Sequence, residues 1–146
     1  MTAPRKGITR QEAMHRVLQG MADDRAGYAA LHTLLEEQFQ ATLHHQSAQL
    51  TLLAEQVIAA VEPLDARRRQ RVSLVTALLG PQGDMPQLFA LLQESARTTA
   101  ERDWAALEQM VLECKRLNTR NSDLLTEQYS IMQRVLHGEE DTYAPG

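Results

Sequence analysis

The sequence predicts an all-α protein, an elongated antiparallel helical bundle with coiled-coil-like packing. Apolar residues recur every three or four positions along most of the 146 residues, which is the period of an amphipathic helix. Apolar residues make up 43% of the chain and aromatic residues only 4%, so we expect an aliphatic core. No stretch alternates β-branched and polar residues between hairpin turns, as strands do. We expect three long helices and one short helix in a single domain over residues 1–137, followed by a flexible acidic tail at 138–146.

The first long helix is expected over residues 9–44, after a short flexible lead-in. Thr9 and Glu12 have the spacing of a capping box, in which two side chains satisfy free backbone amides at a helix start. Gly20 and Gly27 interrupt the apolar rhythm. Each costs about 1 kcal/mol relative to alanine inside a helix. We therefore expect fraying or a bend between these two glycines.

A second long helix is expected to follow the polar stretch at 44–47, where Ser47 could serve as the N-cap. That stretch is either a tight turn or a helix that runs straight on. Further along, Pro63 removes one backbone hydrogen bond and disfavours helical geometry at Glu62. The sequence leaves open whether the helix is kinked or restarts there.

The clearest break in the chain is Gly80-Pro81-Gln82-Gly83-Asp84. Two glycines and a proline within four residues end a helix and form a loop. Asp84 can then cap a short helix, with Pro86 in the first turn, where proline is tolerated.

The last helix is the longest, expected from Thr98 or Thr99 to a stop at Gly138. It carries a broad apolar face, but Asn118, Asn121 and Gln128 occupy positions of that face where leucine would be expected. An asparagine there can fix the register of a helix pair, face a gap or water, or bond to a partner helix. These three interpretations stay open at this point. The apolar positions are Trp104, Leu107, Met110, Val111, Cys114, Leu117, Leu124, Leu125, Ile131, Met132 and Val135.

No catalytic residue, cofactor site or metal site is expected. The five histidines show no spacing that would bring ligands together on one helix face. Cys114 lies on the apolar face of the last helix with no base nearby, so we expect a small buried thiol and not a nucleophile. Glycine-rich phosphate loops and serine-nucleophile signatures are absent from the sequence. We therefore do not expect an enzyme.

Charge and cysteine content restrict the partners and the compartment. A net charge of −4 disfavours nucleic acid, which needs clustered positive charge. The arginine run at residues 67–71 is expected to be a solvated, salt-bridged face, with a nucleic-acid or acidic-partner site as the alternative. One cysteine and the absence of a long apolar run predict a cytoplasmic protein that does not insert into a membrane.

Three features suggest a known family. Leu78-Leu79-Gly80 closes a helix after the arginine run, and Trp104 precedes the run Leu117-Asn118-x-x-Asn121-x-x-Leu124-Leu125. The tail Thr142-Tyr143-Ala144-Pro145-Gly146 has a tyrosine and a terminal glycine. In this order the features resemble the FlgN-like flagellar type III export chaperones, which serve the hook–filament junction proteins.

The resemblance implies a binding protein that holds the amphipathic C-terminal helices of hook-associated proteins and prevents their premature association. It also implies delivery of these clients to the flagellar export gate, with Tyr143 as a gate contact. Two competing hypotheses stay open: a structural coiled-coil module that forms a homodimer, and a regulatory adaptor. A weak homo-oligomer is compatible with each of them. The implied client contacts are Asn118, Asn121, Leu124, Leu125, Gln128, Ile131 and Met132.

Overall fold

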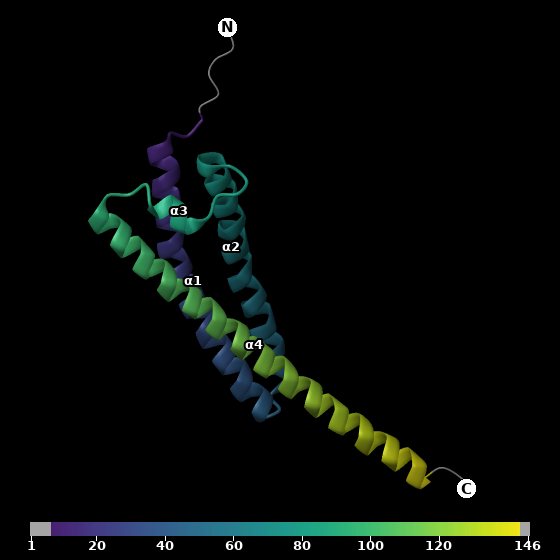
Figure 1. Ribbon diagram of the computed structural model, residues 1–146. Helices are drawn as coiled ribbons and strands as arrows, with labels where there is room; N and C mark the ends of the chain where they lie inside the picture. The colour runs from purple at the N-terminus through teal and green to yellow at the C-terminus, as the bar shows by residue number, and fades with distance from the viewer. Residues whose placement is uncertain (1–6, 144–146) are drawn as a thin grey trace.

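The computed structural model describes residues 7–143, and their side chains up to residue 138. Its elements are α1 (Arg10–Leu43), α2 (Ser47–Leu79), α3 (Met85–Phe89) and α4 (Glu94–Tyr143) (Figure 1). Between residues 7 and 143 there is no strand. The predicted all-α class, with three long helices and one short one, is confirmed.

A tight turn joins α1 to α2 as an antiparallel hairpin (Figure 1). The amide of Gln46 donates to the carbonyl of Ala41 at 2.9 Å, and His45 adopts a positive φ of 53°. Ser47 is the first helical residue and Gln46 is the cap, without a side-chain bond, so the predicted cap is wrong by one position. Helix α2 then continues through Pro63 without a restart.

Helix α1 starts at Arg10 after Thr9, which forms its half of the predicted capping box, and it is continuous through Gly20 and Gly27, without the fraying expected there. The Thr9 hydroxyl accepts the amide of Glu12 at 3.0 Å. Gly27 has a packing role instead, because a Cβ built there would lie 2.8 Å from Cδ2 of Leu64 on α2. The missing side chain allows the two helices to approach closely at this level.

The loop after α2 and the short helix α3 agree with the sequence-based prediction. Gly80 has a positive φ of 87°, a conformation open to glycine. The Asp84 carboxylate accepts the amide of Gln87, whose side chain returns a bond to the backbone of Asp84, which completes a capping box. Pro86 lies in the first turn.

Helix α1 lies in the middle of the fold. It packs against α2 on one side and α4 on the other, and α3 joins α2 to α4 at one end (Figure 1). In the described chain, no Cα atom of α2 comes within 8 Å of one in α4. The bundle is therefore open between α2 and α4.

Two clusters hold most of the buried apolar residues, one at the α3 end of the fold and one between α1, α2 and α4. In the first, Phe89 meets Trp104 edge to face, with ring centroids 6.4 Å apart. The first cluster comprises Ala13, Val17, Met21, Leu74, Val75, Met85, Leu88, Phe89, Ala100 and Leu107, and the second Leu31, Leu35, Leu64, Cys114 and Leu117.

Helix α4 is longer than predicted at both ends. It begins at Glu94 because Thr98 and Thr99 bond back to the carbonyls four residues earlier and continue the helix instead of capping it. It does not stop at Gly138 but runs to Tyr143, since this glycine keeps a negative φ and no proline follows until residue 145. Residues 1–6 of the expected lead-in and 144–146 of the expected tail lie outside the described residues.

The C-terminal part of α4 extends past the tip of the α1–α2 hairpin (Figure 1). Asn121 is the last buried residue of α4 among its described side chains. We call residues 122–138 the projecting segment.

Candidate helix-docking site

A buried aspartate links α1 to the arginine run of α2. Asp24 is only 1% exposed. Its Oδ1 accepts from Nε of Arg67 at 2.6 Å and its Oδ2 from Nη1 of Arg71 at 2.7 Å. A buried carboxylate is tolerated when charge-assisted hydrogen bonds replace its water. Sequence reasoning missed Asp24, although the spacing of four between these arginines places both on one helix face.

The rest of the arginine run behaves as the sequence predicted. Arg68 and Arg69 pair with Asp65 within the helix, and all three side chains are about half exposed or more. The expectation of a solvated face is therefore right for this half of the run and wrong for Arg67 and Arg71.

A polar layer closes the contact between α1 and α4. Asn121 is 4% exposed, and its Nδ2 donates to the carbonyl of Leu35 at 2.7 Å and to Oε1 of Gln38 at 3.0 Å. The interpretation in which this amide faces a gap or water is wrong, because both groups belong to α1. The fixed geometry of these bonds defines the register of the two helices.

Arg120 completes this layer from the side. Its Nη2 donates to Oε1 of Glu36 at 3.0 Å and to Oδ1 of Asn121 at 3.1 Å. Its guanidinium carbon also lies 3.7 Å from the ring centroid of Phe39, a cation–π contact. Beyond this layer, α4 makes a further side-chain hydrogen bond to α1.

This hydrogen bond from α4 to α1 is made by the half-buried Gln128, whose Nε2 donates to the carbonyl of Thr42 at 3.0 Å. One residue after Thr42, α1 ends. The projecting segment is left without cover from α1 beyond this point.

Large apolar side chains remain exposed on the projecting segment. They recur at a spacing of three and four, which places them along one broad side of the helix. This is the same side by which Leu117 and Asn121 pack on α1 further up. The exposed fractions are 52% for Leu125, 60% for Tyr129, 45% for Ile131, 54% for Met132, 58% for Val135 and 55% for Leu136.

The structure divides the predicted client contacts into three groups. Leu125, Ile131 and Met132 lie together on the exposed face, while Leu124 and Gln128 are half-buried at its beginning. Asn121 is buried with its hydrogen bonds made inside the chain. Asn118 is exposed and lies apart from both, where it lines a hollow beside α2. Tyr143 is the last residue of α4, and its side chain lies outside the described set.

Cys114 is buried, and its Sγ lies 3.7 Å from the carbonyl oxygen of Tyr28. Burial, and secondarily the charge of Glu113, raises the pKa of this thiol above its ordinary value, which opposes the thiolate that a nucleophile needs. Residues 7–138 contain no group of three side chains suited to hold a metal ion. None of the described helices is long and apolar enough to cross a membrane.

The fold is all-helical, and its longest helix exposes an apolar face. Residues 14–137 match the family described as FlgN protein. The chain belongs to the FlgN family of flagellar export chaperones, a family of chaperones and not of enzymes. Comparisons with curated proteins and with solved structures give no match.

Proposed function

We propose that the projecting segment of α4 binds the amphipathic C-terminal helices of hook-associated proteins and holds them apart until export. The observation that carries this proposal is the continuation of one apolar face. In the N-terminal half of α4 this face packs against α1, and after residue 128 it has no described cover. A client helix would take the position that α1 leaves when it turns back at residue 44.

The spacing of the exposed residues suits such a contact. Leu125, Tyr129, Met132 and Leu136 form one stripe at intervals of four, three and four, and Leu124, Ile131 and Val135 form a second stripe beside it. A helix laid in a groove is recognised through anchors at these intervals. Met132 is unbranched and adapts its shape to different neighbours, which favours binding of more than one client.

The affinity contribution of this face can be estimated. Covering a half-exposed leucine or methionine contributes about 1 kcal/mol, half the value for full burial. Truncation of Leu125 and Met132 together should therefore weaken client binding by about 30-fold, since 1.4 kcal/mol corresponds to a factor of about ten. Both side chains are more than half exposed, so the free chain should keep its stability.

Calorimetry with a purified hook-associated protein from the same organism tests this proposal. We expect micromolar or tighter binding, a loss of about 30-fold for Leu125→Ala with Met132→Ala, and no loss for Ile58→Ala. Ile58 is a matched control because it is 61% exposed but lies on α2. Absence of binding, or equal affinities of the three proteins, would contradict the proposal. Sedimentation that shows a tight dimer through the same face would favour the structural homodimer.

We further propose that client binding takes place in the cytoplasm. We also propose that Tyr143 contacts the export gate. The support for the gate contact is that Tyr143 is the last residue of α4, a helix whose C-terminal end lies away from the α1–α2 hairpin (Figure 1). Tyr143→Ala should leave client affinity unchanged and reduce the amount of exported client. Full export by this variant would rule out the gate contact.

A further inference from the structure

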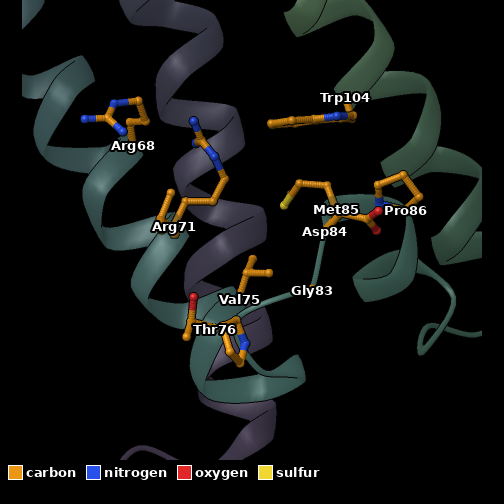
Figure 2. Close-up of a pocket in the computed structure, with 11 residues that line it drawn as sticks. Arg68, Arg71, Val75, Thr76, Gly83, Asp84, Met85, Pro86 and Trp104 are labelled. Atoms are coloured by element: carbon orange, nitrogen blue, oxygen red, sulfur yellow. The ribbon is translucent and has the colours of Figure 1, made fainter.

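Three adjoining hollows follow the gap between α2 and α4. The first, of about 490 Å³, lies between α2, α3 and Trp104 (Figure 2). The others, of about 340 and 300 Å³, continue toward Asn118. The first two share Arg68, Arg71 and Trp104, and the last two share Tyr28, Val111 and Lys115. Together they form one channel on the surface, which we call the α2–α4 groove.

The floor and rims of this groove are apolar. Helix α1 contributes the floor through Leu31 and Leu35. The rims carry Val61, Val72 and Leu112, whose side chains are 41%, 55% and 56% exposed. Exposed aliphatic groups that line a hollow, in contrast to scattered ones, mark an interaction surface.

Positive charge collects along the same groove. Arg67 and Arg71 share the single carboxylate of Asp24, so one partly buried guanidinium charge is in excess. In Figure 2, Arg68 and Arg71 on α2 lie across the hollow from Trp104 on α4, and the guanidinium of Arg71 is 5.2 Å from that ring.

Among the residues that line the groove, the three cations outnumber the two carboxylates, Asp84 and Glu108. The exposed Lys115 adds a cation to the second and third hollows, and Glu108 is the acidic residue that lines the second. Asp84 lines the first hollow and keeps its negative charge while it accepts the amide of Gln87. Arg68 pairs with Asp65, a carboxylate that it shares with Arg69.

We propose that the α2–α4 groove docks an amphipathic helix of a partner protein whose flanks carry carboxylates. The apolar face of that helix contacts Val61, Val72 and Leu112, and its carboxylates meet Arg68, Arg71 and Lys115. Between Trp104 and Asn118, α4 rises about 21 Å, which corresponds to about four helical turns. The site is separate from the projecting segment, so the proposal goes beyond the client function and does not depend on it.

Trp104 gives a local signal for this binding, because it is the single tryptophan of the chain and lines the groove. The probe is a synthetic amphipathic peptide of leucine, alanine and glutamate, and a second peptide carries lysine in place of each glutamate. The acidic peptide should shift the emission of Trp104 to shorter wavelength, and the lysine peptide should bind at least about tenfold more weakly.

Two double variants with equal charge change locate the site. Arg68→Glu with Lys115→Glu should weaken the acidic peptide at least about tenfold. Arg16→Glu with Arg102→Glu, on exposed positions that do not line the groove, should leave its affinity unchanged. Circular dichroism confirms that both variants are folded.

Several outcomes overturn the proposal. They are an unchanged Trp104 emission at about 100 μM acidic peptide, equal affinities for the two peptides, and equal effects of the two double variants. A dimer in sedimentation that Leu112→Asp disperses would mean that a second copy of the chain fills the groove, and would also overturn it. Client binding through the projecting segment can persist in each of these cases, so the two proposals fail separately.

Discussion

Replacement of Asp24 by asparagine tests how the fold is held together between α1 and α2. Asp24 is buried and binds Nε of Arg67 and Nη1 of Arg71 at 2.6 and 2.7 Å. Asparagine keeps the size of the side chain but removes its charge and one of its two acceptors. Both arginines then remain partly buried without a counter-charge.

The expected loss of stability is about 3 kcal/mol. Removal of one member of a buried ion pair costs about 3–5 kcal/mol. The lower end applies here because the two arginine side chains are 24% and 16% exposed, so water partly solvates their charges. This loss corresponds to a change in the folding equilibrium of more than 100-fold, at about 1.4 kcal/mol for each factor of ten.

Urea unfolding followed by circular dichroism measures this loss. Asp65→Asn is the matched control, because Asp65 also pairs with two arginines of the same run but is 47% exposed. The control should cost about 0.5 kcal/mol or less. Equal losses for Asp24→Asn and Asp65→Asn would refute the reasoning, as would a loss for Asp24→Asn below about 1 kcal/mol.

Three further predictions concern single residues. Gly20→Ala should raise the free energy of unfolding by about 1 kcal/mol, whereas Gly27→Ala should lower it by about 1 kcal/mol because the new methyl group meets Leu64. Equal unfolding free energies of the two variants in urea would contradict this. Asn121→Ala should cost about 2 kcal/mol, since groups on α1 lose their buried partner, and the exposed Asn118→Ala less than about 0.5 kcal/mol; similar costs would argue against the polar layer. The Cys114 thiol should react more slowly with a thiol reagent in the folded chain than in the unfolded chain. Because its pKa is raised on folding, it stabilises the fold below the unfolded pKa, and this contribution is lost as pH rises through the folded pKa; stability that rises with alkaline pH would oppose the assignment.

The helices were predictable because their signals are local. Apolar spacing revealed the three long helices, and glycine with proline marked the loop after residue 79. The same local signals misplaced both ends of α4. Threonine often caps a helix start and glycine often ends a helix, but Thr98, Thr99 and Gly138 do neither here. These local preferences are weaker than the cooperative extension of an established long helix.

The burial of particular polar residues was not predictable, since it depends on contacts between distant segments. Asp24 follows another aspartate and precedes an arginine in the sequence, and nothing local distinguishes it as the buried one. Asn121 was recognised as unusual for its position, but its partners on α1 lie more than 80 residues away. The open side between α2 and α4 likewise follows from helix packing and not from composition.

Amide hydrogen exchange of α4 with and without a hook-associated protein tests the central proposal most directly. We expect slowed exchange in residues 122–138 when the client is bound, because its helix would cover the exposed apolar face and stabilise this segment. Residues 104–121 pack against α1 already and should change little. Unchanged exchange in residues 122–138 in the presence of bound client would contradict the proposal, because the client would then bind elsewhere on the chain.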